Sequence, residues 1–194
     1  MKKILTIIVI LILNINTANS IEPDIFVQST VNRASEILSK NISKEEKIEN
    51  LKLIAEETVD IKGIGFYTLG SYRKTLNEEQ KKEYTKLFKS YFLKSFSSRL
   101  SEYSNPQIEV NSKEKLNENY TIVNSTLIAT DERPEVKIDW RIYTKNQNNP
   151  LIRDLIIEGL SLARTQKEEF SSIIQTNDGD INILFKTLKK FSNK

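Results

Sequence analysis

Residues 154–170 read DLIIEGLSLARTQKEEF, and this stretch determines how the rest of the chain is interpreted. Residues 155–157 form an unbroken apolar run, which is typical of a strand that is covered on both faces. Gly159 lets the chain bend, because glycine adopts backbone angles that other residues resist. The residues beyond the bend have the pattern of an amphipathic helix. We therefore expect a buried strand that runs directly into a helix.

The start of this helix has two candidate caps. Ser161 is placed to cap it directly, whereas Thr165 and Glu168 have the spacing of a capping box that begins slightly later. Residues 159–163 are also similar to a degenerate G-x-S-x-G nucleophile elbow. A serine nucleophile of that kind needs a histidine base, and the chain has no histidine. We therefore interpret Ser161 as a helix cap.

Residues 1–20 have the composition of a signal peptide. A basic start precedes an almost continuous apolar run over residues 4–15, and Ala18 and Ser20 occupy the two positions that a signal peptidase reads. The apolar run is too short for a comfortable membrane span. We expect cleavage after Ser20, which leaves a soluble, exported domain over residues 21–194.

The amino-acid composition excludes several kinds of chemistry. The chain contains no cysteine and no histidine. It therefore has no disulfide framework, no zinc site of the usual kind, no haem or iron–sulfur ligation and no Cys/His catalysis. The fold must be stabilised by its apolar core, and the length is sufficient for one.

The charge gives no support for a nucleic-acid partner. Two of the 29 basic residues, Lys2 and Lys3, lie in the leader, so the others nearly balance the 26 acidic residues. The small clusters Lys81-Lys82 and Lys189-Lys190 fall within helices of mixed charge. We interpret them as solvated helix faces, because nucleic-acid binding usually needs a clustered basic face.

The mature chain begins with a predicted series of helices. Ser43 and Glu46 form a capping box for the second helix, and Gly63 and Gly65 are expected in the connection that follows it. They do not continue into a G-x-G-x-x-G phosphate-binding loop, because the spacing fails. A short helix is expected over residues 66–73.

The longest helix is expected at about residues 76–103, with Thr75 and Glu78 as its capping box. This helix can be a central core element, or its rings can line a cavity for an apolar ligand, and spacing alone does not separate the two. Its buried stripe is unusually aromatic and consists of Tyr84, Leu87, Phe88, Tyr91, Phe92, Phe96, Leu100 and Tyr103.

Four consecutive strands with short turns follow, from residue 107 to residue 157, and predict an antiparallel meander. Val136, Ile138, Trp140 and Ile142 alternate with polar residues and so share one face. We expect a twisted sheet that the long aromatic helix covers on one face. Two further helices end the chain, which gives one α+β domain.

The sequence contains the blocks LGSYR (residues 69–73) and DLIIEGLS (residues 154–161). Together they resemble the MlaC family of periplasmic phospholipid-binding proteins, also called the toluene-tolerance family. Residues 69–73 (LGSYR) are similar to the family's leucine–glycine–x–aromatic–basic motif, and the aromatic helix follows. Residues 154–161 (DLIIEGLS) are similar to its D-x-x-x-E-G-x-S signature. The resemblance covers about residues 31–188, although Arg153 before the second motif is not part of it.

The resemblance implies a soluble carrier, not an enzyme, that moves phospholipid between the outer and inner membranes of a Gram-negative envelope and so maintains outer-membrane lipid asymmetry. It implies a curved antiparallel sheet of about four strands, wrapped by helices in an NTF2-like shape around an apolar pocket. It implies no cofactor or metal. The implied partners are an inner-membrane complex of an MCE protein with an ABC transporter, and an outer-membrane lipoprotein–porin complex.

Helical spacing and strand parity then predict which residues line such a pocket. The predicted lining consists of Leu69, Tyr72, Tyr84, Phe88, Tyr91, Phe92, Ile122, Val136, Ile138, Trp140, Ile142 and Ile156. The residues expected to have a structural role in the two motifs are Gly70, Asp154, Glu158, Gly159 and Ser161.

Two other functions are compatible with the sequence. An enzyme of similar shape would use Asp154 or Glu158 as a base, but four residues along a strand separate them by ~13 Å, too far for a cooperating pair. We therefore expect both carboxylates to make structural hydrogen bonds. A periplasmic interaction domain with a packed core and no lipid remains the alternative, because an aromatic core and an aromatic cavity have the same sequence pattern.

Overall fold

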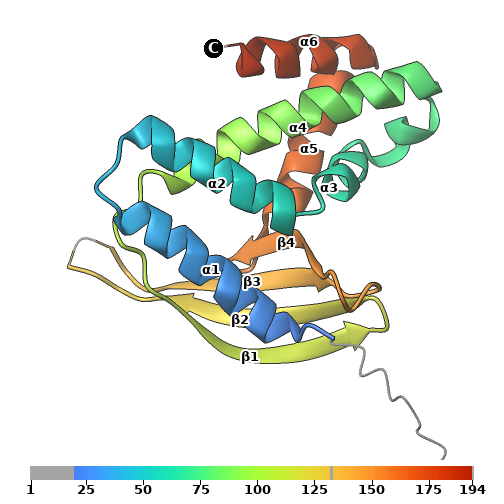
Figure 1. Ribbon diagram of the computed structural model, residues 1–194. Helices are drawn as coiled ribbons and strands as arrows, with labels where there is room; N and C mark the ends of the chain where they lie inside the picture. The colour runs from blue at the N-terminus through green and yellow to red at the C-terminus, as the bar shows by residue number, and fades with distance from the viewer. Residues whose placement is uncertain (1–19, 132, 194) are drawn as a thin grey trace, which may run out of the picture.

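The computed structural model describes residues 20–131 and 133–193, so the expected leader, apart from Ser20, lies outside the described residues. The described chain is one α+β domain, as expected, with a layer of helices against a single sheet (Figure 1). In chain order the elements are α1 (Pro23–Ser39), α2 (Lys44–Thr58), α3 (Ile61–Thr68), the 3-10 helix η1 (Gly70–Lys74), α4 (Glu78–Leu100), β1 (Ile108–Asn117), β2 (Tyr120–Leu127), β3 (Val136–Tyr143), β4 (Leu151–Ile157), β5 (Leu160–Ser161), α5 (Leu162–Gln175) and α6 (Ile181–Ser192).

The strands form an antiparallel meander in the order β1-β2-β3-β4-β5. The four long strands are those that the sequence predicts, but β5 is additional. Glu158 and Gly159 have φ angles of 49° and 80°, and the chain turns back so that Leu160 pairs with Ile157. A two-residue turn with both φ angles positive matches the twist of hairpin strands. The connection between β4 and α5 is therefore a tight hairpin and not a simple bend.

Alternation along β3 separates the two faces of the sheet as predicted. Ile138, Trp140 and Ile142 are buried, whereas Lys137 is exposed. The Trp140 Nε1–H donates to Ser125 Oγ at 2.8 Å, and the Ser125 hydroxyl donates to the Ile138 carbonyl at 2.9 Å. Since its one polar group is satisfied, the indole stays within the apolar layer in a fixed orientation.

The long aromatic helix does not cover the sheet, contrary to the prediction. α1 lies across β1 and β2 instead (Figure 1), and its Gln28 side chain donates to the Ile108 carbonyl and accepts from the Val110 N–H. α4 packs mainly against α2, α3 and α6. α1 covers β1 and β2, and the aromatic side chains of α4 face β3 and β4 across a cavity instead of packing directly on the sheet.

Gly63 and Gly65 lie inside α3 and not in a connection. Asp60 caps this helix, and its carboxylate accepts from the Gly63 N–H at 2.8 Å. A Cβ atom at Gly65 would lie 2.8 Å from Cδ1 of Phe88, so glycine lets α4 pack directly against the backbone of α3. Close helix packing here outweighs the low helix propensity of glycine.

The helix caps differ from the prediction in one place. α4 begins with a capping box of Asn77 and Gln80 instead of Thr75 and Glu78. Thr75 has helical backbone angles at the end of η1, and its hydroxyl donates to a carbonyl of that turn, so it is not available as a cap. The capping box predicted for α2 is present, and α5 starts at Ser161.

Candidate functional site

An apolar cavity of about 210 Å³ lies between α4, α5 and the strands β3 and β4. The end of α2 and the start of α3 also contribute to it, through Val59 and Ile64. Aromatic and aliphatic side chains form most of its wall, and polar side chains are concentrated on the α4 and α5 sides. This combination of an apolar interior and a few polar groups is typical of a small-molecule site.

Aromatic rings of α4 form one wall of the cavity. Phe88, Phe92 and Phe96 follow one another along the helix, with ring centroids 6.1 Å and 5.5 Å apart and the rings stacked. Phe170 of α5 packs edge-on against Phe88 at 6.2 Å. Offset and edge-on contacts are the favoured arrangements of aromatic rings. Ring contacts within the protein therefore stabilise this wall.

Side chains of β3 and β4 form the opposite wall. Trp140 pairs with Leu155, so both lie on the same face of the sheet. Ile152 also lines the cavity, although it is three residues from Leu155. The reason is a bulge: Asp154 pairs with Arg141 and Ile152 with Ile142, so Arg153 is an extra residue between them. Ile152 and Leu155 therefore face the same side of the sheet.

Asp154 joins the sheet to α5 at the edge of the cavity. Its side chain is buried, and it accepts from the Ser161 hydroxyl at 2.6 Å and from the Ala163 N–H at 3.0 Å. The Arg141 guanidinium lies 3.8 Å away. Ser161 Oγ in turn accepts from the Arg164 N–H at 3.1 Å and caps α5. The first turn of α5 is thus fixed to β4.

The other motif residues also have structural partners. The Glu158 carboxylate accepts from the Lys137 N–H at 2.5 Å. Gly159, the other residue of this turn, has the positive φ angle that the turn requires. Gly70 begins η1 with φ +57°, and a Cβ there would lie 3.1 Å from the Lys167 side chain. Asp154 and Glu158 therefore bind different backbone groups and do not face one another as an acid–base pair.

The polar side of the cavity is organised around Tyr91. Its hydroxyl donates to Gln166 Oε1 at 2.7 Å, and Gln166 Nε2 donates to the Glu169 carboxylate at 2.8 Å. Burial raises the pKa of Tyr91, and the Glu169 charge raises it further, whereas the Gln166 hydrogen bond and Arg99 lower it. The phenol therefore stays protonated, with its ring in the wall and its hydroxyl among the polar groups.

Four of the predicted pocket residues line the cavity: Phe88, Tyr91, Phe92 and Trp140. The structure places Leu69, Tyr84, Ile138 and Ile142 in the buried core outside the cavity, and Tyr72 and Val136 partly buried against that core. Tyr84 is the clearest example, because its hydroxyl donates to the Gly65 carbonyl at 3.1 Å and its ring packs between α3 and α6.

Ile122 and Ile156 lie on the other face of the sheet. Ile122 pairs with Arg141 and Ile156 with Asp139, and both of these β3 residues alternate with Trp140. The cavity residue of β4 is Leu155, one position earlier than predicted. Because side chains alternate along a strand, a shift of one residue places a side chain on the opposite face.

Several lining residues are absent from the predicted set. Phe96 belongs to the aromatic stripe of the long helix and could have been found from its spacing. Leu162, Thr165 and Gln166 of α5 also line the cavity. The sequence predicts α5 as a helix but contains no signal that its first turns face α4, so these residues could not be assigned.

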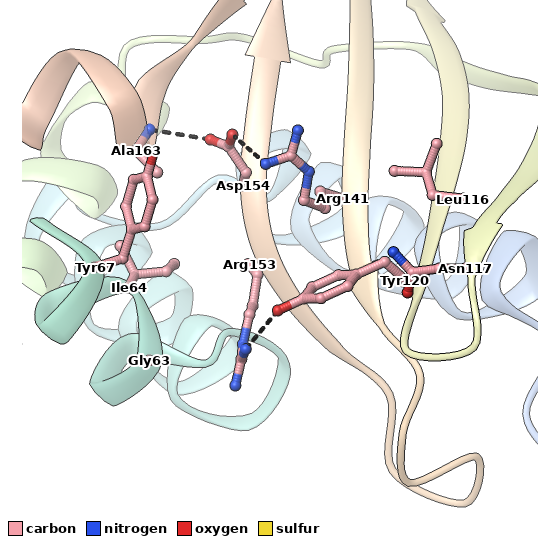
Figure 2. Close-up of a pocket in the computed structure, with 10 residues that line it drawn as sticks. All are labelled: Gly63, Ile64, Tyr67, Leu116, Asn117, Tyr120, Arg141, Arg153, Asp154 and Ala163. Carbon is pink, nitrogen blue, oxygen red and sulfur yellow. Dashed lines mark hydrogen bonds and ion pairs between the residues drawn. The ribbon is translucent and has the colours of Figure 1, made fainter.

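A second, more polar pocket of about 350 Å³ lies on the other face of the sheet (Figure 2). Arg153 dominates it: the guanidinium donates to Asp60 and to the Tyr120 hydroxyl, each at 2.6 Å, and lies over the Tyr143 ring. Burial lowers the pKa of Arg153, but these hydrogen bonds more than offset that effect and raise it. Arg153 thus connects β4 to the start of α3, and its charge is already paired.

A third pocket, with both polar and apolar walls, lies between Tyr67 of α3 and the exposed side of α5. Across residues 20–131 and 133–193, no helix has the length and apolarity needed to cross a membrane. The same residues contain no group of three His, Cys, Asp or Glu side chains that could hold a metal ion. The apolar cavity is the candidate site because aromatic and aliphatic walls enclose it together with a few polar groups.

The fold and this cavity define an α+β ligand-binding domain with an apolar interior. A sequence model of the MlaC protein family matches residues 28–190, and the chain therefore belongs to the MlaC family. Among solved structures, it is similar to the phospholipid-binding protein from Ralstonia solanacearum, which was solved in complex with a phospholipid. The TM-score is 0.74 at 17% sequence identity, and the match covers 89% of this chain and 98% of that chain. This likeness confirms the fold expected from the sequence.

Proposed function

We propose that this protein is a phospholipid carrier that holds acyl chains in the apolar cavity between α4, α5 and the sheet. The observation that carries the proposal is the cavity itself, whose rings Phe88, Phe92 and Phe96 face Trp140 and Leu155 across an apolar space. Membership of the MlaC family and the phospholipid held by the similar Ralstonia protein support it.

The energetics of lipid transfer explain why such a cavity is needed. A phospholipid with two acyl chains has ~30 methylenes, and their exposure to water costs on the order of 24 kcal/mol. Spontaneous passage through an aqueous compartment is therefore negligible. A carrier lowers this cost by offering an apolar interior during the passage, and it needs no covalent or metal chemistry for the task.

The volume of the cavity suggests how lipid enters it. At about 210 Å³ it is smaller than the roughly 300–1,000 Å³ of typical small-molecule sites. We expect the acyl chains to widen it by rotating the partly exposed rings of Phe92 and Phe96. These two rings stack on one another, with centroids 5.5 Å apart, which reduces the apolar surface exposed to water.

We place this activity in the periplasm. The proposed leader over residues 1–20 would direct export and be removed after Ser20, leaving residues 21–194 as the working domain. By its family, the carrier would exchange lipid with an inner-membrane complex of an MCE protein and an ABC transporter, and with an outer-membrane lipoprotein–porin complex. This traffic would maintain the lipid asymmetry of the outer membrane.

We propose a carrier and not an enzyme, because the candidate acid–base residues are occupied. Asp154 accepts hydrogen bonds from Ser161 and Ala163, and Glu158 accepts one from Lys137. Each Asp154 oxygen accepts one of these structural hydrogen bonds, and Glu158 does not line the cavity.

Transfer between vesicles tests the carrier role. Purified residues 21–194 are mixed with donor vesicles that contain a fluorescent phospholipid and with unlabelled acceptor vesicles. We expect the protein to accelerate transfer in proportion to its concentration, and the Phe92→Glu variant to lose this effect. If the folded protein binds phospholipid but does not accelerate its transfer, the carrier role is wrong.

A further inference from the structure

Two opposite charges flank the polar side of the apolar cavity. Arg99, in the last turn of α4, and Glu169 of α5 both line the cavity, and both are exposed. Within the part of the chain that the structure describes, they form no ion pair with each other or with any other residue. The Glu169 carboxylate accepts one hydrogen bond, from Gln166.

Neighbouring charges on α5 behave differently. Arg164 and Glu168 do not line the cavity, and they form an ion pair with each other at 3.0 Å. Within the described residues, Arg99 and Glu169 are thus exposed charges on the cavity lining that have no ion-pair partner. An unpaired charge beside an apolar wall is less screened than one on an open surface, which favours a charged ligand group there.

The two charges lie on the same side of the cavity, within electrostatic reach of one hydroxyl. Glu169 raises and Arg99 lowers the pKa of Tyr91, in addition to the dominant effect of burial. Tyr91 also donates to Gln166, the residue that donates to Glu169. The apolar wall, one cation and one anion therefore meet around Tyr91.

We propose that Arg99 and Glu169 form a head-group site that selects zwitterionic phospholipids, with the phosphate on Arg99 and the ammonium group beside Glu169. This inference rests on the proposed function, because it needs acyl chains in the cavity. A planar guanidinium with free N–H donors matches a phosphate oxygen pair. The Glu169 carboxylate attracts an ethanolamine or choline ammonium group, and it repels a lipid of net negative charge.

A simpler explanation of both residues makes a different prediction. Arg99 is close to the C-terminal end of α4, where a cation interacts favourably with the helix dipole, and Glu169 adds to the solubility of α5. On that explanation, the head group of the bound lipid has no effect on affinity. Replacing either residue would then change stability slightly but would leave lipid selectivity unchanged.

Binding of two soluble short-chain lipids separates these explanations. Dioctanoyl phosphatidylcholine and dioctanoyl phosphatidylglycerol are titrated into residues 21–194 by isothermal calorimetry. We expect the unmodified protein to prefer the zwitterionic lipid by about tenfold, and Arg99→Gln to weaken both lipids by about tenfold, in line with a charge-assisted hydrogen bond. Glu169→Gln should remove the preference, chiefly by improving binding of phosphatidylglycerol.

Two variants of the paired charges outside the cavity serve as matched controls. Arg164→Gln and Glu168→Gln make the same changes of charge on α5, and we expect both to bind the two lipids as the unmodified protein does. If Arg99→Gln and Glu169→Gln behave like these controls, the head-group site is wrong while the acyl-chain cavity stands. If the unmodified protein binds neither lipid, the proposed function itself is contradicted.

Discussion

The ring of Phe88 in α4 packs directly against the backbone of Gly65 in α3, at a place where a Cβ atom would lie 2.8 Å from the ring. The Gly65 carbonyl also accepts hydrogen bonds from the hydroxyls of Thr68, at 2.7 Å, and Tyr84, at 3.1 Å. This contact sets how closely α3 and α4 approach, and it positions the first ring of the cavity wall.

Gly65→Ala is expected to destabilise the protein. The added methyl group overlaps Phe88, and overpacking of a core costs roughly 1–3 kcal/mol. The gain in helix propensity is about 1 kcal/mol at most, so the net effect is a loss. The free energy of unfolding is measured in urea for Gly65→Ala, for Phe88→Leu and for the double variant that carries both substitutions. The smaller side chain should recover part of the loss, and strictly additive effects would contradict the proposed contact.

Asp154→Asn is expected to lower the free energy of unfolding by roughly 2 kcal/mol, because hydrogen bonds to a buried carboxylate are stronger than those to an amide. Ser161→Ala should cost about 1 kcal/mol through the loss of the α5 cap. Since the two residues share a hydrogen bond of 2.6 Å, the double variant should lose less than the sum. Thermal or urea unfolding measures all three, and an Asp154→Asn variant as stable as the unmodified protein would contradict the structural role.

Phe92→Glu is expected to abolish phospholipid loading while the protein still folds. Phe92 is only partly buried, so the substitution places a charge in the cavity without disrupting the central core. Leu53→Glu is the matched control, because Leu53 is 60% exposed on α2 and does not line the cavity. Lipid extraction after purification measures loading. Normal loading of a folded Phe92→Glu variant would remove this residue from the site.

Ser95→Trp is expected to change stability and lipid binding in opposite directions. Ser95 lines the cavity, so an indole there fills empty space, which typically stabilises a protein by about 0.5–2 kcal/mol. The same ring would occupy the volume that an acyl chain needs. Ser98→Trp, one turn later and outside the cavity, is the control. A Ser95→Trp variant that binds as much phospholipid as the control would show that lipid lies elsewhere.

Asp24 is expected to contribute a pH-dependent stability. Its hydrogen bond from Lys113, at 2.7 Å, lowers the pKa of Asp24 below the usual 3.8, against the smaller opposing effect of burial. A carboxylate with a lowered pKa stabilises the folded state at neutral pH, and this stability is lost as the pH falls through 3.8 and below. Because the pair is partly exposed, Asp24→Asn should cost at most about 1 kcal/mol at pH 7. Urea unfolding at pH 7 and near pH 3 should show a smaller difference at the lower pH. A difference of equal size at both pH values would contradict this cause.

Local patterns predicted much of the fold. The strand, turn and helix of residues 154–170 are present, and the alternation along β3 places Trp140 on the cavity face. Both depend on rules that act within a few residues of the chain. The turn at Glu158 and Gly159 also forms where glycine predicted a bend, although its hairpin geometry was not apparent.

The errors arise where distant segments meet. The bulge at Arg153 changes the parity of β4, so Leu155 and not Ile156 faces the cavity. Nothing in the alternation of apolar residues marks a bulge. The direction of the α4 rings was also undetermined, because Tyr84 and Phe88 belong to one helical stripe but only Phe88 reaches the cavity. That difference depends on the packing of α3 and α6 against α4.

Native mass spectrometry of residues 21–194, purified from a bacterial periplasm, tests the central claim most directly. Lipid extracted from the same sample identifies any added mass. We predict one bound phospholipid per chain, with Phe92→Glu measured in parallel as the unloaded reference. A mass without lipid, unchanged after incubation with vesicles and with detergent-solubilised phospholipid, would contradict the carrier and favour a packed interaction domain.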